Sequence, residues 1–332
     1  LSTSAGASND IAIRLARWST RRPYIISFIG GYYGTTYGSL SLTSLGPHYR
    51  RGQSPLVPGI VDVPYPYCYR CPFKLEHPEC GVQCLSYIED YAFKTFLPAE
   101  DVAAINIEPI QGDAGWIVPP EGYLPRLKRI CEDHGILFIA EEVQTGLGRT
   151  GKMFACEHWG IEPDMMVLGK ALASGMPISA CVAKAEIADP EGRETPFISI
   201  FSFTSSVVCF AAALATLEII EEERLAENAA RVGEYMIKRL VDMKNHKIVG
   251  DVRGKGLLIG VEIVKDKERK EPGAKEAQHI CDRAFKKGLL LIPGGIYGSV
   301  LRIAPPLIIT KEQAEIGLNI IEEVISEVET NA

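Results

Sequence analysis

The sequence predicts an α/β fold, in which a large domain with a mostly parallel sheet covered by helices precedes a smaller C-terminal α+β domain. The first observation is that apolar strands alternate with helical segments over the first two thirds of the chain, which is typical of a parallel sheet buried on both faces. The second is a change to shorter elements from about Glu222. The third is size, because 332 residues, 46% of them hydrophobic, suffice for two cores. We expect a large domain over residues 1–222 and a small one over residues 223–332.

The charge composition limits the classes of molecule that we expect this protein to bind. The chain has 35 Lys and Arg against 42 Asp and Glu, a formal net charge of −7. Such a surface repels phosphate backbones and anionic lipids, so we expect no nucleic acid and no membrane as partner. No charged-then-apolar leader is found, and we expect a cytoplasmic protein. The uncharged residues 195–217 include Pro196 and several hydroxyls, which favours a strand, a loop and a buried helix over a spanning helix.

The N-terminal elements follow from small and polar residues. Residues 2–10 are mostly small and predict a loop, and Asn9 or Asp10 is expected to cap the helix that follows. After Pro23, a short strand is expected over Tyr24–Phe28, followed by a loop rich in Gly and Tyr.

A repeating pattern then predicts the sheet. Apolar strands are expected at Val102–Ile107, 136–140 and Met165–Leu168, with an amphipathic helix over Tyr123–His134. Glu108, Glu141 and Lys170 follow the ends of these strands. Because ligands of open α/β sheets bind at the carboxyl ends of the strands, we expect these three side chains to converge on one site.

The C-terminal part predicts a separate, smaller unit. The expected elements are a helix over 224–243, strands at 249–252 and 257–264, a helix near 276–287, strands at 289–292 and Val300–Ile303, and a final helix from Thr310.

Residues 146–152 (Gly-Leu-Gly-Arg-Thr-Gly-Lys) match two phosphate-binding patterns. However, Met153 stands where a Ser or Thr would hold Mg²⁺, and Glu141 and Glu142 would repel a pyrophosphate. We therefore favour a turn at this position, and a nucleotide-dependent enzyme is kept as an alternative class of function.

Four cysteines with short spacings form a second candidate site. Cys68, Cys71, Cys80 and Cys84 are spaced Cys-x2-Cys-x8-Cys-x3-Cys, with His77 among them. The spacing suits a structural zinc site or two disulfides, and both readings stay open. A zinc-organised binding module without catalysis is the third class of function.

Lys170 carries the strongest chemical signal. It lies between an apolar strand and a stretch of small residues, with no acidic residue close by. Dry surroundings lower the pKa of a lysine, which suits Schiff-base chemistry. A solvated loop lysine is the plain alternative.

Together the motifs resemble class III (ω-type) pyridoxal-phosphate (PLP) aminotransferases, a family that includes 4-aminobutyrate and ornithine-type enzymes. The resemblance covers essentially the whole chain and implies PLP fold type I, PLP as cofactor and a homodimer. It implies that Lys170 binds PLP covalently, that Glu141 meets the pyridine nitrogen, that Val143 packs on the ring, and that Gln144 approaches the ring hydroxyl. An ionised carboxylate is needed there because the ring accepts electrons only while its nitrogen is protonated.

The remaining roles implied by the resemblance concern the phosphate, the ring face and the substrate. They fall on the phosphate-cupping turn at Ala5 and Gly6, the stacking ring of Tyr32, Glu108 beside the cofactor, a phosphate contact by Ser202 from the dimer partner, the substrate-binding Arg302, and Asp113, which pairs with that arginine when no carboxylate occupies it. The physical reasons are that phosphate prefers a helix N-terminus and a carboxylate prefers a fork of donors.

The sequence departs from the family pattern at several of these positions. Glu141 replaces the usual Asp, Tyr33 replaces a His, and Ala5 with Gly6 loses a hydroxyl. The family's N-terminal segment is not found in this chain.

The cysteine-rich segment 68–84 resembles an archaeal branch of the family that includes amino-acid racemases. We favour transfer of an amino group from an ω-amino acid such as 4-aminobutyrate to a 2-oxo acid such as 2-oxoglutarate. Racemisation of an amino acid on the same scaffold is the alternative. Both reactions begin with removal of the Cα proton by Lys170, and they differ in where a proton returns.

Overall fold

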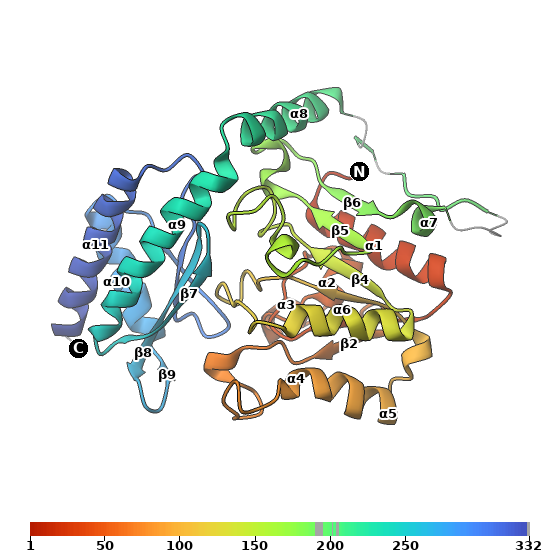
Figure 1. Ribbon diagram of the computed structural model, residues 1–332, viewed down its shortest axis with the longest axis horizontal. Coiled ribbons are helices and arrows are strands. Elements are labelled where there is room, and N and C mark those ends of the chain that lie inside the picture. The colour runs from red at the N-terminus through yellow and green to blue at the C-terminus, as the bar shows by residue number, and fades with distance from the viewer. Residues whose placement is uncertain (190–194, 201, 204–205, 331–332) are drawn as a thin grey trace. The chain divides into compact units, whose positions relative to one another are not determined.

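The computed structural model describes residues 1–189, 195–200, 202–203 and 206–330 (Figure 1). The chain divides into two compact units. The first unit consists of Leu1–Pro109, Pro119–Leu147 and Phe154–Ile219, and the second of Ile110–Val118, Gly148–Met153 and Ile220–Ala332. Two short segments from within the predicted large domain therefore belong to the second unit.

The first unit is built on a mostly parallel sheet, as the sequence predicts. Within the described residues this sheet has six strands in the order β2-β1-β3-β4-β5-β6, and only β6 runs antiparallel to its neighbour. The strands are β1 (Tyr24–Phe28), β2 (Ile60–Val63), β3 (Val102–Ile107), β4 (Leu137–Glu141), β5 (Met165–Leu168) and β6 (Ala180–Ala183). Every residue of β3 is buried, as expected for a central strand covered on both faces.

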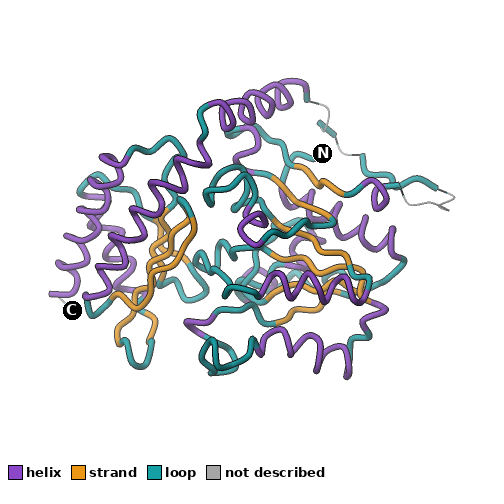
Figure 2. Tube along the Cα trace, viewed as in Figure 1, coloured by secondary structure: helices purple, strands orange, loops and turns teal. Residues whose placement is uncertain are grey.

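Helices lie beside this sheet (Figure 2). They are α1 (Ala5–Thr20), α2 (Tyr37–Leu42), α3 (Pro47–Arg50), α4 (Gln83–Ser86), α5 (Phe93–Thr95), α6 (Tyr123–His134), α7 (Ala185–Ala188) and α8 (Val207–Glu222), the last of which extends past the end of this unit. Helix α1 packs against β3, β5 and β6, and α6 packs against β4.

Helix α1 begins earlier than the sequence predicts. Ser4 is the N-cap, and its hydroxyl accepts a hydrogen bond from the backbone N–H of Ala7 at 3.3 Å. The predicted cap at Asn9 or Asp10 is wrong, because both residues lie inside the helix and bind other segments with their side chains. The small residues at the start of the chain thus form the first turn of a helix rather than a loop.

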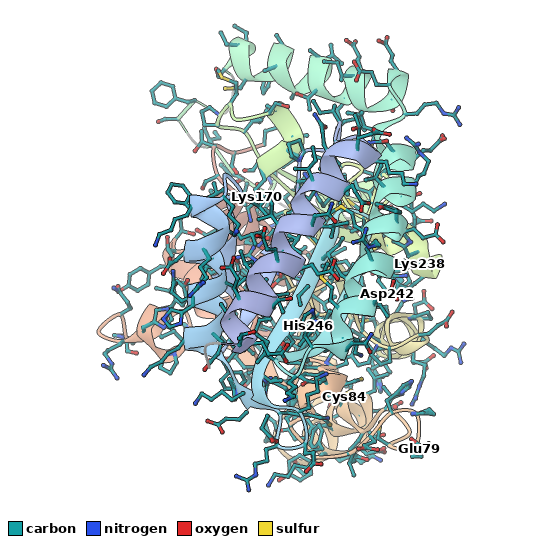
Figure 3. All side chains as sticks on the ribbon, turned by 90° about the vertical axis from the view of Figure 1, so that its left-hand side faces the viewer. Glu79, Cys84, Lys170, Lys238, Asp242 and His246 are labelled. Carbon is teal, nitrogen blue, oxygen red and sulfur yellow. The ribbon has the colours of Figure 1, made fainter. Side chains whose placement is uncertain are left out.

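The second unit has an antiparallel sheet with helices packed on it. Among the described residues the strands are β7 (Val249–Lys255), β8 (Leu258–Asp266), β9 (Glu271–Pro272), β10 (Ile292–Gly294) and β11 (Val300–Ile303), in the order β10-β11-β8-β7 with β9 beside β8. The helices are α9 (Leu225–Asp242), α10 (Ala274–Lys286) and α11 (Lys311–Thr330), which lie side by side in Figure 3. Their apolar faces form one core with the sheet, so this unit has the α+β architecture that the sequence predicts.

Helix α8 differs from its prediction as a buried helix. Cys209, Ala213 and Ile220 face the protein and are buried, whereas Val207 and Leu214 are exposed in the single chain. Among the described residues, no helix combines the length and the apolar character that crossing a membrane requires. The uncharged sequence therefore produces a helix with an exposed apolar face.

Candidate active site

A cavity of about 430 Å³ lies in the first unit, where the carboxyl ends of β1, β4 and β5 meet the start of α1. Its lining residues are Thr3, Ser4, Ala5, Gly6, Tyr32, Tyr33, Gly34, Thr35, Thr36, Glu141, Val143, Gln144, Lys170, Gly175, Met176, Pro177 and Ile178. The parallel strands thus bring together seven residues that the sequence predicts for one site, namely Ala5, Gly6, Tyr32, Glu141, Val143, Gln144 and Lys170.

The first turn of α1 forms one wall of the cavity. Ala5 and Gly6 present the N-terminal end of a 16-residue helix, where backbone N–H groups lack carbonyl partners within the helix and favour an anion. Gly34 has a φ of +121°, and a Cβ on it would lie 2.7 Å from the Cα of Gly6. The loop after β1 therefore approaches the helix so closely that a side chain at Gly34 has no space. This wall can hold a phosphate group with backbone donors.

A hydroxyl that the sequence did not indicate lies at the same wall. The Oγ1 atom of Thr36 is 2.9 Å from Oγ of Ser39, and Thr36 lines the cavity. Thr36 thus places a hydroxyl near the turn at Ala5 and Gly6, where the family's own hydroxyl is missing.

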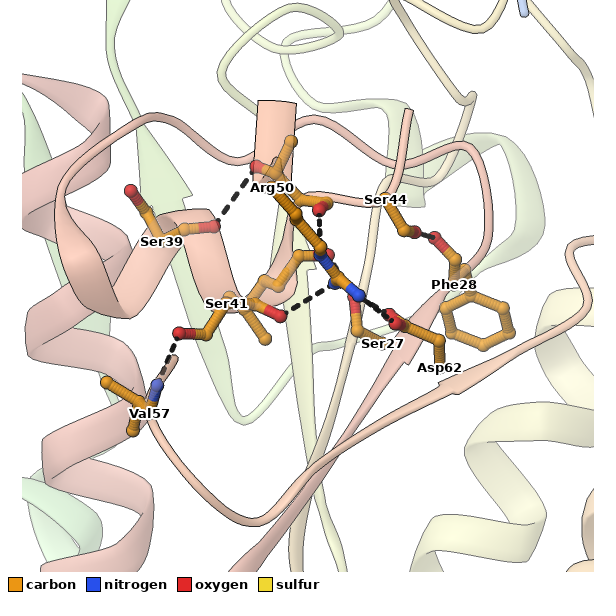
Figure 4. Close-up of polar contacts among 10 residues, drawn as sticks. Ser27, Phe28, Ser39, Ser41, Ser44, Arg50, Val57 and Asp62 are labelled. Atoms are coloured by element: carbon orange, nitrogen blue, oxygen red, sulfur yellow. Dashed lines mark hydrogen bonds and ion pairs between the residues drawn. The ribbon is translucent and has the colours of Figure 1, made fainter. Parts of the chain in front are cut away.

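Thr43 and Arg50 hold the loop that carries Tyr33 and Gly34. The Thr43 hydroxyl accepts from the N–H of Tyr33 at 2.9 Å and donates to the carbonyl of Gly34 at 3.0 Å. Arg50 donates from Nε to the Thr43 carbonyl at 2.6 Å and from Nη1 to Asp62 at 2.6 Å (Figure 4). Neither residue could be found from the sequence, because a threonine and an arginine in a loop carry no pattern that separates them from surface residues.

Two buried carboxyl groups are connected to the site: Glu141 lines the cavity, whereas Glu108 is not one of its lining residues and contacts Tyr32, which is. Glu141, at the end of β4, is 3% exposed, and its Oε1 accepts from Nδ2 of Asn9 at 3.3 Å. Glu108 is 2% exposed and accepts from the backbone N–H of Tyr32 at 3.0 Å. Burial and then the charge of Glu108 raise the pKa of Glu141 well above its ordinary value, against the opposing effects of Lys170 and Asn9. A cation placed beside Glu141 would therefore be needed to favour its ionised form.

Lys170 lies two residues after the carboxyl end of β5, beyond Gly169. Its φ of 44° lies in the left-handed region, where a non-glycine residue costs about 1–3 kcal/mol and is typically found at functional sites. The side chain, labelled in Figure 3, is exposed rather than in the dry surroundings predicted, because a 3-10 turn over Lys170–Ala173 carries it out of the sheet. It lines the cavity together with Glu141.

Tyr32 and Tyr33 have different surroundings. Tyr33 is buried, and its hydroxyl donates to the backbone carbonyl of Asn106 at 3.2 Å. Burial raises the pKa of the Tyr33 hydroxyl well above its ordinary value, so it stays protonated. The ring of Tyr32 lies 5.5 Å from that of Tyr49 at a tilted angle and lines the cavity.

In the second unit, Arg302 is paired with Asp113. Nη1 of Arg302 lies 2.6 Å from Oδ1 of Asp113, and its guanidinium carbon lies 4.3 Å from the ring centre of Trp116. Nε of Arg253 donates to the carbonyl of Gly115 at 2.9 Å. This hydrogen bond restrains the segment that carries Asp113 and Trp116, the two residues that contact Arg302. The pairing of Arg302 with Asp113 agrees with the sequence expectation, whereas Trp116 carried no signal in the sequence.

Ser202 is described in the structure but is not one of the cavity's lining residues. It is exposed in the single chain. Its expected contact from a dimer partner therefore stays a prediction.

Residues 148–152 of the glycine-rich stretch belong to the second unit and are explained by packing within it. Gly151 has a φ of +93°, and a Cβ on it would lie 2.9 Å from Cβ of Ala230. The guanidinium of Arg149 donates to the carbonyls of Leu257 and Pro305. These contacts leave no reason to place a nucleotide phosphate here.

The four clustered cysteines are free thiols in the structure. They line a small space of about 20 Å³ together with His77. Burial and neighbouring Cys68 raise the pKa of Cys84 to about 12, so this thiol is protonated at neutral pH. Across the described residues, no group of three or more His, Cys, Asp or Glu is arranged to hold a metal ion. The zinc hypothesis is therefore not supported, and no disulfide is formed among these four cysteines.

Residues 1–325 match the family model described as aminotransferase class-III. The chain is 46% identical over 323 residues to an alanine/serine racemase of Pyrococcus horikoshii, covering 96% of this chain and 67% of that protein. It is 47% identical over 330 residues to a leucine/methionine racemase of Thermococcus litoralis, covering 98% and 72%. A probable 4-aminobutyrate aminotransferase of Bacillus subtilis is 35% identical over 320 residues, covering 96% and 72%.

A solved structure of an amine transaminase has a similar fold. An amine transaminase from an uncultivated Pseudomonas species, in its PLP-bound form, superimposes with a TM-score of 0.91 at 32% identity, covering 98% of this chain and 76% of that one.

Proposed function

The chain belongs to the class III aminotransferase family and has PLP fold type I, and we propose that it is a PLP-dependent racemase of neutral amino acids. The observation that carries this proposal is the difference in identity, 46–47% to two racemases against 35% to a 4-aminobutyrate aminotransferase. The sequence motifs alone favoured transamination of an ω-amino acid. The relatives support racemisation better than transamination, because the identity to the racemases is higher. The motifs alone could not separate the two reactions, because both reactions use them.

The residues of the cavity fit PLP. The first turn of α1, at Ala5 and Gly6, suits the phosphate. Lys170 and Glu141 line the same cavity as this turn. Burial opposes the ionisation of the Glu141 carboxyl group. A protonated pyridine nitrogen is a cation, and beside Glu141 it would favour the ionised carboxylate. When bound, PLP supplies an electron sink that acidifies the Cα proton of an attached amino acid.

The side chains of the protein determine how the Cα proton of the substrate is removed and where a proton returns. Lys170 and Glu141 line the same cavity, so with PLP bound Lys170 would remove the Cα proton as general base and Glu141 would hold a proton on the ring nitrogen. A racemase then returns a proton to the opposite face of Cα, which requires a second donor on that side. A transaminase returns the proton to the cofactor instead and needs a 2-oxo acid to regenerate it.

The relatives support a substrate with a neutral side chain, and Arg302 is the residue proposed to bind its carboxylate. Asp113 pairs with Arg302 at 2.6 Å, as the resemblance implies for this arginine while no substrate carboxylate occupies it. The two racemase relatives are named for alanine and serine and for leucine and methionine, all amino acids without a charged side chain. We propose that Arg302 binds the α-carboxylate of such an amino acid through its fork of donors.

A homodimer is part of the proposal. Helix α8 exposes Val207, Val208 and Leu214, and Phe203 beside it is also exposed. Contiguous exposed apolar side chains of this kind mark surfaces that another chain covers. A second copy is the occupant we propose, since Ser202 lies in the same stretch and would serve the partner's phosphate.

The experiment that tests this function compares racemisation with transamination. The protein is loaded with PLP and incubated with L-leucine, L-methionine, L-alanine or L-serine in the absence of any 2-oxo acid, and the enantiomers are separated by chiral chromatography. We expect the D-enantiomer to form, and no activity in Lys170→Ala. Formation of glutamate from 4-aminobutyrate and 2-oxoglutarate, without any D-amino acid, would instead establish the transaminase.

A further inference from the structure

Asn9 is a fully buried polar residue that contacts three segments of the cavity wall. It lies on α1 and is 0% exposed. Its Nδ2 atom is 3.2 Å from the carbonyl of Ala5, 3.0 Å from that of Tyr33 and 3.3 Å from Oε1 of Glu141. One amide group thus connects the turn suited to phosphate, the loop after β1 and the acid at the end of β4.

The orientation of this amide is fixed by a second buried amide. Nδ2 of Asn106, on β3, donates to Oδ1 of Asn9 at 3.2 Å. The backbone carbonyl of Asn106 in turn accepts from the hydroxyl of Tyr33. Because Oδ1 of Asn9 is taken by a donor, its Nδ2 must face Glu141, and a flipped amide would lose these hydrogen bonds.

We propose that Asn9 is a positioning residue that holds Glu141 ionised and oriented toward the pyridine nitrogen of PLP. The proposal rests on the proposed function only in taking PLP as the cofactor, and it applies to racemisation and transamination alike. Glu141 stands where the family pattern has the shorter Asp, and its extra torsion must be restrained for the carboxylate to keep one position. A donor on one oxygen provides that restraint and leaves the carboxylate capacity to accept from the ring.

The charges around Glu141 explain why a donor is needed. Glu108, after β3, opposes ionisation of Glu141, and Lys170, after β5, favours it. Tyr33, from the loop after β1, is protonated and neutral. Burial raises the pKa of Glu141 more than any of these charges, and the Asn9 amide and the backbone N–H of Val143 oppose that rise. Without Asn9, the carboxyl group would take up a proton more readily and would hold a proton on the ring less firmly.

The test uses Asn9→Leu, which keeps the branch at Cγ, with methyl groups in place of the amide oxygen and nitrogen, and has no donor. The matched control is Ser8→Ala, since Ser8 is equally buried on the same helix and bonds Ser2 and Ser179 instead of Glu141. Three quantities are measured in each variant: PLP affinity, attachment of PLP to Lys170 after borohydride reduction, and the pH titration of the absorbance of bound PLP.

We expect Asn9→Leu to keep PLP on Lys170, to bind it about tenfold more weakly and to shift the absorbance titration by about one pH unit. Ser8→Ala should shift neither quantity in this way. In a Glu141→Gln background, Asn9→Leu should cause no further shift, because the acid on which it acts is gone. Should Asn9→Leu fail to fold, Asn9→Ala serves for the same comparison without added bulk.

An absorbance titration unchanged in Asn9→Leu, or a shift of equal size in the Glu141→Gln background, would overturn this role for Asn9. A wild-type protein that binds no PLP at Lys170 would instead contradict the proposed function. The wild-type measurement therefore separates the two failures.

Discussion

The Oε1 atom of Glu108 accepts a hydrogen bond from the backbone N–H of Tyr32 at 3.0 Å, which connects the end of β3 to the loop after β1. Glu108 was expected beside the cofactor, and its observed contact is with the backbone that carries the proposed stacking ring. A buried carboxylate bound to a backbone N–H is a strong restraint on a loop, because such hydrogen bonds are charge-assisted. The position of Tyr32 thus depends on a residue of the neighbouring strand.

Replacing Glu108 should therefore disturb the loop rather than the chemistry. We expect Glu108→Ala to lower the free energy of unfolding by about 1–3 kcal/mol and to weaken PLP binding, because the N–H of Tyr32 loses its acceptor. Glu108→Gln keeps an acceptor oxygen and should bind PLP nearly as the wild type does. Denaturant unfolding and PLP titration measure both quantities. Equal losses in the two variants would show that the charge of Glu108, and not its contact with Tyr32, matters.

The pH dependence of stability should reveal Glu141. Burial and Glu108 raise its pKa above the ordinary value of 4.5 in the folded protein. A carboxyl group with a raised pKa binds more protons in the folded than in the unfolded state, so its contribution to stability is present below the unfolded pKa and is lost as the pH rises through the folded one. We expect PLP-free wild type to lose stability from about pH 4.5 upward relative to Glu141→Gln, which cannot titrate. Melting temperatures across pH, taken as the difference between the two proteins, measure this. A constant difference would mean that Glu141 has an ordinary pKa.

Arg302 offers a test of substrate binding. Lysine keeps the charge but cannot form two parallel hydrogen bonds to a carboxylate. We expect Arg302→Lys to raise the KM for the amino acid about tenfold with a smaller change in kcat. Arg231→Lys, an exposed change on α9, is the control and should leave both constants unchanged. A drop in kcat alone would argue against a role of Arg302 in binding the carboxylate.

Ser202 tests the dimer. We expect light scattering to give twice the mass of one chain for the PLP-loaded protein. Ser202→Ala should weaken PLP binding without changing that mass, since one hydrogen bond to the phosphate is lost, worth about 1.5–3 kcal/mol when the acceptor is charged. An active, PLP-loaded monomer would contradict both the dimer and the role of Ser202.

The residues at the ends of parallel strands were predictable because such ends meet at one edge of the sheet. Glu141 is the last residue of β4, Lys170 lies two residues after β5, and the structure places both on one cavity. The start of α1 was not predictable in this way. Asn9 and Asp10 look like helix caps in the sequence, yet their side chains bind Glu141 and the N–H of Ser39, which are distant along the chain.

Other parts of the site carried no sequence signal at all. The bonds of Thr43 and Arg50 depend on how a loop folds back, and no periodicity encodes that. The same limit applies to the reaction. Removal of the Cα proton needs the same residues in a racemase and in a transaminase, so the motifs alone cannot separate the two.

The most direct test of the central claim follows the Cα proton itself. PLP-loaded protein is incubated with L-leucine in D₂O without any 2-oxo acid, and proton NMR and chiral chromatography are recorded together, with Lys170→Ala as the inactive control. For a racemase we expect loss of the Cα proton signal together with conversion to D-leucine carrying deuterium at Cα, until the enantiomers are equal. Leucine that remains entirely L, while glutamate appears once 4-aminobutyrate and 2-oxoglutarate are supplied, would contradict it.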